Sequence, residues 1–312
     1  MTNSLKDKLN EYKNSGFGAK TDHQPERLIN KDGSVNVKKT GLRFFDHFSV
    51  FHFLVTTNWF TFNILVIVSY LFINILFGVF YWKIGINEIG IKHESELEDL
   101  FESIYFSAQT FSTVGYGRAN PGSHLTNFVA FSEMLVGMMY LALAAGLLFA
   151  RFSRPVAKIV FSKKALIAPY RHGKGFMFRL SNAKTNLLLE VEVKVLLVMN
   201  KVEDGKEVRK FYDLPLEMSK INMLALSWTV VHPLDEESPL LNFDKDSLAN
   251  SKAEFMVLIN GFNNTLSQIV HARTSYKYYD IEWDARFSPI FNNDNGKAVV
   301  AINKISNYEK VH

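Results

Sequence analysis

Two long apolar runs limit what this chain can fold into. Residues 59–82 contain no charged side chain, and residues 125–151 contain only Glu133 and Arg151. As a helix, the first run spans roughly 36 Å at about 1.5 Å per residue, against a hydrocarbon core of about 30 Å. In lipid the backbone must satisfy its own polar groups, so single segments of this length cross a membrane as helices. We therefore predict an outer membrane helix at 59–82 and an inner one at 125–151.

A half-length apolar segment lies between the two runs. Residues 98–110 have apolar side chains at helical spacing but are too short to cross a bilayer, so we expect a re-entrant pore helix. The motif after it is Thr113-Val114-Gly115-Tyr116-Gly117. Glycine at every second position lets the backbone alternate in handedness, so that successive carbonyls point the same way. Stacked carbonyls replace the water shell of K⁺, and the motif predicts a K⁺ selectivity filter. A tight turn in a membrane hairpin is the alternative.

One strand cannot surround an ion, so a filter of this kind requires four copies around an axis, a homotetramer. On the inner helix, a series at four-residue spacing is expected to line the pore: Gly137, Leu141, Ala145 and Phe149. Glu133, one step earlier, is expected behind the filter. An ionisable residue at this depth has two interpretations, a carboxylate that hydrogen-bonds the pore helix or a direct role in permeation.

Charge predicts the orientation. Seven basic residues lie before the first apolar run or at and after the end of the second one: Lys39, Arg43, Arg151, Arg154, Lys158, Lys163 and Lys164. Three basic residues lie in the segment between the two runs: Lys83, Lys92 and Arg118. The positive-inside rule then places both termini in the cytoplasm of an integral, multi-pass membrane protein. A formal net charge of +4 is too small to indicate nucleic-acid binding. The chain has no cysteine, and no nucleophile–base or metal-ligand spacing indicates an enzyme or a cofactor.

Composition and periodicity predict the structure of the remaining segments. Residues 1–40 are polar without period, which predicts a flexible cytoplasmic arm. Residues 41–57 are amphipathic and are expected to lie on the membrane surface, with a core helix of the soluble part as the alternative. The pore domain then covers 58–152. The pattern of residues 153–312 is typical of β-strands and predicts a cytoplasmic β domain. Apolar and polar residues alternate over Leu187–Val198, hairpin turns are expected at 204–205 and 295–296, and strand-like apolar runs occur at 255–259 and 298–302.

Several stretches after the inner helix carry a family resemblance. They are Gly146–Pro155, Val160-Phe161-Ser162, Arg179-Leu180-Ser181-Asn182, Leu189–Val193, Val231–Leu240 and Arg273–Tyr276. Over roughly residues 41–305 the chain resembles the inward-rectifier potassium channels, most closely their prokaryotic (KirBac-type) branch. The resemblance implies a tetramer with cytoplasmic immunoglobulin-like β-sandwiches, located in a bacterial inner membrane.

The resemblance also implies roles for individual residues. Phe149 matches a hydrophobic gate, and Glu190 matches an acid facing the cytoplasmic pore, with a solvated strand carboxylate as the alternative. Residues 261–267 match the loop that narrows that pore, with Gly261 beside Asn260 and with Phe262 or Ser267 near the constriction. Five basic residues become candidate ligands for an anionic phospholipid or phosphoinositide head group: Arg151, Arg154, Lys158, Lys163 and Lys164. A plain positive-inside anchor explains Arg151 and Arg154 equally well.

Departures from the family pattern modify the expected properties. Leu141 and Asn260 stand where eukaryotic members have acids, so weak polyamine rectification is expected, with Ba²⁺, Mg²⁺ or polyamines as blockers. Gln109 and Ala119 replace a Glu–Arg pair behind the filter, so another bond must brace it. The predicted function is passive K⁺ conduction gated by the cytoplasmic domain and anionic lipid. The alternatives are a membrane-anchored ligand sensor with a non-conducting pore, or a subunit of a K⁺ uptake system.

Overall fold

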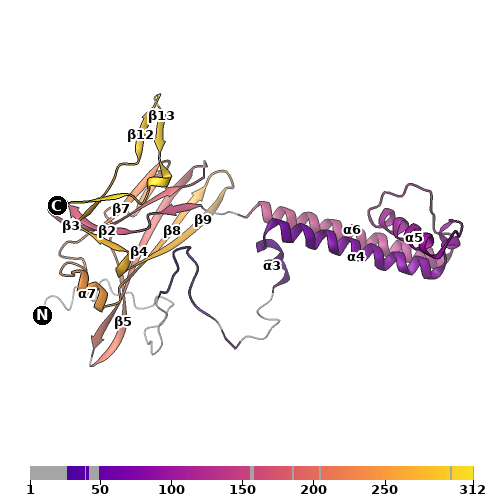
Figure 1. The fold of residues 1–312 in the computed structure, drawn as a ribbon, viewed down its shortest axis with the longest axis horizontal. Helices are drawn as coiled ribbons and strands as arrows, with labels where there is room; N and C mark the ends of the chain where they lie inside the picture. Colours follow the sequence, from indigo (N-terminus) through magenta and orange to yellow (C-terminus); the bar gives the residue numbers. More distant parts are fainter. Residues whose placement is uncertain are drawn as a thin grey trace. The chain divides into compact units, whose positions relative to one another are not determined.

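The computed structural model describes residues 27–38, 40–41, 49–154, 158–184, 186–203, 205–295 and 297–311 (Figure 1). The chain divides into two compact units, one comprising Thr40–Arg154 and the other Met1–Lys39 together with Pro155–His312. The first unit is helical and the second is a β unit. The N-terminal segment thus belongs to the β unit, although it precedes the helices in sequence.

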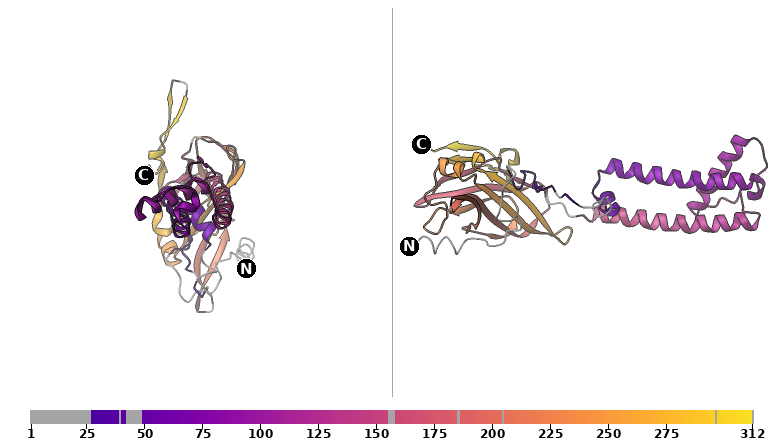
Figure 2. Two further views of the ribbon diagram at one scale, coloured as in Figure 1. Left: turned by 90° about the vertical axis from the view of Figure 1, so that its right-hand side faces the viewer. Right: turned by 90° about the horizontal axis from the view of Figure 1, so that it is seen from below.

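The helical unit consists of α3 (Val50–Thr56), α4 (Trp59–Ile84), the 3₁₀ turn η1 (Ile86–Ile89), α5 (Glu96–Phe111) and α6 (His124–Phe152). In the described chain, α4 and α6 are the two helices long and apolar enough to cross a membrane. They run side by side, and α5 packs against both at one end (Figures 1 and 2). Most of their large apolar side chains are exposed, which is the pattern of a lipid-facing surface.

Local sequence explains where these helices begin. Asn58 and Ser123 cap α4 and α6 with their side chains, and Ser123 forms a capping box with Thr126. Ser95 caps α5, whose first turn holds Glu96, Glu98 and Asp99 at the end where the helix dipole favours anions. With 16 residues, α5 is slightly longer than the expected 98–110 and still too short to span a bilayer.

The amphipathic helix expected over 41–57 is described only in part. Residues 42–48 lie outside the described residues, and α3 covers Val50–Thr56 with no buried side chain. It contacts α6 and belongs to the helical unit, so it is not a core helix of the β unit.

The β unit contains two five-stranded sheets, which confirms the predicted all-β domain. One sheet joins β1 (Ile159–Phe161), β2 (Ala165–Tyr170), β3 (Gly173–Asn182), β7 (Ser227–Pro233) and β10 (Ile281–Trp283). The other joins β4 (Leu188–Glu203), β5 (Lys206–Asp213), β6 (Lys220–Leu224), β8 (Glu254–Asn263) and β9 (Gln268–Lys277). The remaining elements are α7 (Lys245–Asn250), η2 (Tyr278–Asp280), η3 (Ile302–Lys304) and the strand pairs β11 (Ala285–Phe287) with β14 (Tyr308–Lys310) and β12 (Phe291–Asp294) with β13 (Lys297–Val300).

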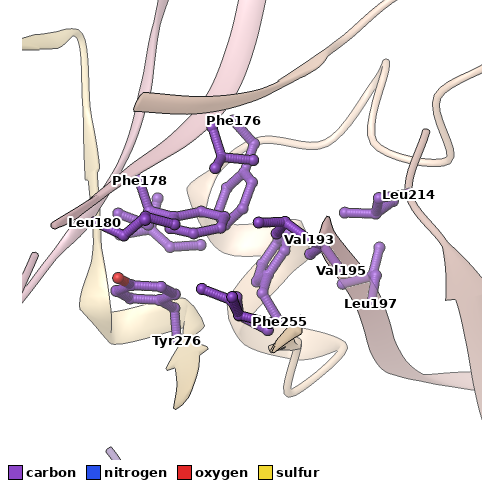
Figure 3. Close-up of a cluster of buried hydrophobic side chains, with 14 of the residues drawn as sticks. Phe176, Phe178, Leu180, Val193, Val195, Leu197, Leu214, Phe255 and Tyr276 are labelled. Atoms are coloured by element: carbon purple, nitrogen blue, oxygen red, sulfur yellow. The ribbon is translucent and has the colours of Figure 1, made fainter. Parts of the chain in front are cut away.

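The core of the β unit lies between the two large sheets. Val193, Val195 and Leu197 point into it from β4, as the alternation over 187–198 predicts, and meet aromatic side chains from the opposite sheet (Figure 3). Phe176 and Phe255 stack across this core with ring centroids 4.2 Å apart. The run expected over 298–302 is shorter, since β13 ends at Val300 and Ile302 begins a 3₁₀ turn.

The described end of the N-terminal segment corrects the expectation of a flexible arm. Leu28 and Ile29 are only 3% and 2% exposed, and they pack with Val198, Phe211 and Met256 on the β unit. An isolated apolar pair in a polar stretch carries no periodicity, so the sequence pattern did not reveal this docking site. Residues 1–26 of the expected arm lie outside the described residues.

Candidate ion-conduction site

The backbone of the motif 113–117 alternates as a carbonyl filter requires. The φ angle is positive at every second residue, 60° at Thr113, 54° at Gly115 and 83° at Gly117. Glycine adopts this conformation at little cost, whereas a β-branched threonine at positive φ is strained. The motif is thus held away from an ordinary extended or helical path, and strain of this kind persists only where the surroundings impose it.

The pore helix supports the inner end of this motif. The amides of Val114 and Gly115 both donate to the carbonyl of Gln109, at 2.9 and 3.3 Å, and the Thr113 amide donates to the Thr110 carbonyl at 3.1 Å. The motif therefore begins by folding back on the last turn of α5. This places it at the carbonyl end of the helix, where the dipole is negative and favours a cation.

The outer end of the motif is tied to neighbouring loops. Arg118 forms an ion pair with Glu102 of α5 at 2.7 Å. The Asn120 side chain donates to the Gly117 carbonyl at 3.1 Å, and its backbone amide donates to the Ile89 carbonyl at 2.9 Å. These bonds join the segment leaving the motif to α5 and η1. The Arg118–Glu102 pair involves neither Gln109 nor Ala119, the two positions that replace the family's ion pair.

Glu133 lies at the contact between three helices. Its side chain is fully buried and accepts hydrogen bonds from the Tyr81 hydroxyl of α4, at 2.7 Å, and from the Ser107 hydroxyl of α5. This arrangement has the geometry of the first interpretation, a carboxylate that bonds to the pore helix. Tyr81 itself is fully buried and packs edge-on against Phe106.

The inner-helix series divides into two parts. Leu141, Ala145 and Phe149 are exposed on the single chain, with Phe149 72% exposed, as residues that line a shared axis must be before assembly. Gly137 is buried instead, against the backbone of Phe111 at the end of α5, where a Cβ atom would lie only 3.0 Å from the Phe111 carbonyl carbon. The expectation that Gly137 lines the pore is therefore wrong, because helix packing occupies its open side.

Arg151 departs from the role of a free lipid ligand. Its guanidinium donates to the carbonyls of Leu54 and Thr57, at 2.5 and 2.7 Å, and lies over the rings of Trp59 and Phe62. The side chain therefore caps the end of α3 and fastens it to α6. The last carbonyls of a helix have no partner within the helix, so a cation is favoured at the end of α3.

The other four basic candidates fall into two groups. Lys164 donates to the Tyr279 carbonyl at 2.7 Å and lies 3.7 Å from the Glu282 carboxylate, so its charge is already partnered. Arg154, Lys158 and Lys163 are exposed. A cationic side chain near an anionic leaflet gains about 1 kcal/mol, and these three are the basic candidates whose positions leave the charged group accessible.

Glu190 occupies a β-bulge on β4. Its φ angle is +51°, and the register between β4 and β8 shifts between Leu189 and Glu192. The bulge turns the carboxylate out of the ladder, where it forms an ion pair with Lys220 of β6. A paired carboxylate attracts cations less than the free acid expected from the sequence. The sequence did not reveal this pair, because Lys220 lies 30 positions further along the chain.

The residues expected at the pore constriction are mostly in a strand. Asn260, Gly261 and Phe262 lie on β8, and the turn itself begins after Asn263. The Asn260 side-chain oxygen accepts a hydrogen bond from His271 Nδ1 at 2.7 Å on the outer face of the sheet. Gly261 faces the core instead, where a Cβ atom added to it would lie 3.2 Å from the Val191 side chain. Gly261 is therefore not at a pore surface. Ser267 lies in the exposed turn with a φ of +50°.

Comparison with known proteins covers both units. Residues 159–312 match the family model "Inward rectifier potassium channel C-terminal domain", and residues 44–154 match the model "Ion channel". The chain is 35% identical over 279 residues to the inward rectifier potassium channel Kirbac3.1 of Paramagnetospirillum magnetotacticum, covering 88% of this chain and 92% of that one. The chain belongs to the inward-rectifier potassium channel family, in its prokaryotic branch. Human ATP-sensitive inward rectifier potassium channel 8 is 26% identical over 316 residues, covering 91% of this chain and 74% of the human protein.

Membership of this family confirms the fold class, a two-helix pore with a re-entrant helix and a C-terminal β domain, in an integral membrane protein. It also confirms that the chain is of an ion-channel family and not of an enzyme family. Sequence reasoning missed the partners Tyr81 and Ser107 of Glu133. The buried acid was the available signal, since a carboxylate at this depth requires hydrogen-bond donors.

Proposed function

We propose that the chain forms a homotetrameric, K⁺-selective channel that conducts passively across the membrane. The observation that carries this proposal is the alternation of positive φ angles at 113, 115 and 117, directly after a helix too short to span the bilayer. Four such strands around an axis would stack their carbonyls around dehydrated K⁺ ions. The names of the relatives, both inward rectifier potassium channels, support the same function.

The inner helix would close the pore at Phe149. This ring is 72% exposed and stands one turn beyond Ala145. Four phenylalanine rings at a constriction exclude water and stop ion passage by dewetting. Gating by the β unit and by an anionic lipid would act through α3, which Arg151 fastens to α6, and through the exposed Arg154, Lys158 and Lys163.

Polyamine or Mg²⁺ rectification would be weak. Leu141 and Asn260 carry no charge, and Lys220 neutralises Glu190. Of the three positions where the family pattern has acids, two are therefore uncharged here and the third is paired. With basic flanks on the side of the β unit, both termini would lie in the cytoplasm, in a bacterial inner membrane.

The test is Rb⁺ or K⁺ uptake into liposomes that contain the purified protein, with Na⁺ as competitor and Ba²⁺ as blocker. A lipid series with and without anionic phospholipid or phosphoinositide gives the sign of regulation. Barium-sensitive uptake that Na⁺ does not compete away is expected. Uptake that is absent in every lipid, while the protein stays tetrameric, would favour the ligand sensor with a non-conducting pore. A protein that transports only with added subunits would favour the uptake system.

A further inference from the structure

The carboxylate of Glu133 joins the three long helices of the helical unit. It accepts from Tyr81 of α4 at 2.7 Å and from Ser107 of α5, while belonging to α6 itself. Tyr81, Ser107 and Glu133 are each 0% exposed. In such a dry environment a hydrogen bond is stronger than in water, and an unmade one is costly. We call these three residues the three-helix clamp.

Helices α5 and α6 touch again one helical turn further on, at Phe111 and Gly137. Phe111 follows Ser107 by four residues on α5, and Gly137 follows Glu133 by four residues on α6. Gly137 meets the backbone of Phe111 so closely that it leaves no room for a side chain. One face of α6 therefore contacts one face of α5 over a full turn, first by a hydrogen bond and then by backbone contact.

This face of α5 is continuous with the filter. Ser107 lies two residues before Gln109, whose carbonyl receives the amides of Val114 and Gly115. A shift of Ser107 is therefore passed through one helical turn to the first residues of the filter. Ion discrimination depends on the number and field of the carbonyls around the ion, so small displacements of these residues change it.

We propose that the three-helix clamp positions the pore helix and thereby sets how well the filter discriminates K⁺ from Na⁺, an inference that rests on the proposed channel function. Glu133, Tyr81 and Ser107 are positioning residues, since they act through α5 and need not contact the ion. The clamp also couples the filter to the inner helix. Glu133 and Phe149 are 16 residues apart on α6, roughly 24 Å, so a movement of α6 at Phe149 is transmitted to α5 through the clamp.

The test compares variants that each change one residue of the three-helix clamp. Tyr81→Phe and Ser107→Ala each delete one bond to Glu133 while leaving the helix intact, and Glu133→Gln retains the side-chain shape and one acceptor oxygen. Tyr140→Phe is the matched control. The Tyr140 hydroxyl joins α6 to α4 by donating to the Val66 carbonyl at 2.6 Å. The Tyr140 ring packs against Phe111 of α5 with centroids 5.5 Å apart, and the variant retains that ring.

Each variant is reconstituted as the full-length tetramer, and Na⁺ competition against Rb⁺ uptake is measured beside its thermal stability in detergent. Loss of one clamp bond is expected to reduce the K⁺-over-Na⁺ discrimination about fivefold, the factor for one net hydrogen bond. Glu133→Gln should fall between these variants and the wild-type protein. Tyr140→Phe should keep wild-type discrimination even where its melting temperature falls.

Three results would overturn the inference. Clamp variants with wild-type discrimination would show that the clamp only stabilises the helices. A Tyr140→Phe variant that loses as much discrimination as Tyr81→Phe would show that the effect is general to helix packing. A wild-type protein without selective flux would instead remove the proposed function, and the clamp inference with it. The wild-type measurement therefore separates the two failures.

Discussion

One buried carboxylate, Glu254, binds the backbone of residues 27–36 to the β unit. Glu254 is 2% exposed and accepts the backbone amides of Leu28, at 2.9 Å, and Ile29, at 3.2 Å. We call residues 27–36 the N-terminal strap. Further bonds to the β unit come from Ser275 and Thr274, which donate to the carbonyls of Ile29 and Lys31. Arg27 and Lys31 of the strap also form ion pairs with the buried carboxylate of Asp280.

Glu254→Gln should raise the population of the open strap without unfolding the β unit. Glutamine retains one acceptor oxygen, but its amide nitrogen is a donor and would face a backbone N–H, leaving one buried donor without an acceptor. Such an unmade hydrogen bond costs about 1–3 kcal/mol, which corresponds to a roughly 5- to 150-fold rise in the population of the open strap.

The assay is hydrogen–deuterium exchange of the peptide covering 27–38 in the full-length tetramer. In the docked strap the amides of Asn30 and Asn36 donate to Ser34 and Leu28, so their exchange reports opening. Glu203→Gln is the control, because Glu203 pairs with Lys210 at 3.2 Å on an exposed strand end, and surface pairs contribute little. Unchanged exchange in Glu254→Gln, or an equal rise in the control, would refute the assignment of Glu254 as the anchor.

Three further outcomes are expected. Phe149→Ala should raise basal Rb⁺ uptake several-fold because the constriction loses its apolar rings, and unchanged uptake would move the gate away from this residue. Lys220→Gln should strengthen Mg²⁺ or spermine block several-fold by leaving Glu190 unpaired, and the double variant with Glu190→Gln should return to the wild-type block. Burial lowers the pKa of His232, which donates to the Pro215 carbonyl and accepts from Ser238, so the folded state binds this proton less readily than the unfolded chain. The contribution of neutral His232 to the free energy of unfolding is therefore fully present above about pH 6.5 and is lost as the pH falls below that value. In His232→Gln the melting temperature should change less between about pH 5 and 6.5 than it does in the wild-type protein. An equally steep dependence in the variant would contradict this assignment.

The sequence by itself determined the class of the protein and the position of its filter. Two apolar runs, a half-length segment and Thr113–Gly117 impose their structure locally, because a lipid-facing backbone must be helical and alternate glycines permit one unusual path. The alternation over 187–198 likewise predicted which side chains of β4 face the core, since strand periodicity needs no distant partner.

Only the tertiary structure decided which charges are free and which are paired. Glu133 meets Ser107 across 26 positions, Arg151 meets Leu54 across 97, and Glu254 meets Leu28 across 226. The sequence showed each of these ionisable groups but not its partner. Gly137 shows the same limit for packing, because its place in a four-residue series agreed with a pore-lining role until α5 was found against it. Periodicity is set by neighbours along one helix, whereas the partner of a buried group is set by the helix or strand that packs on it.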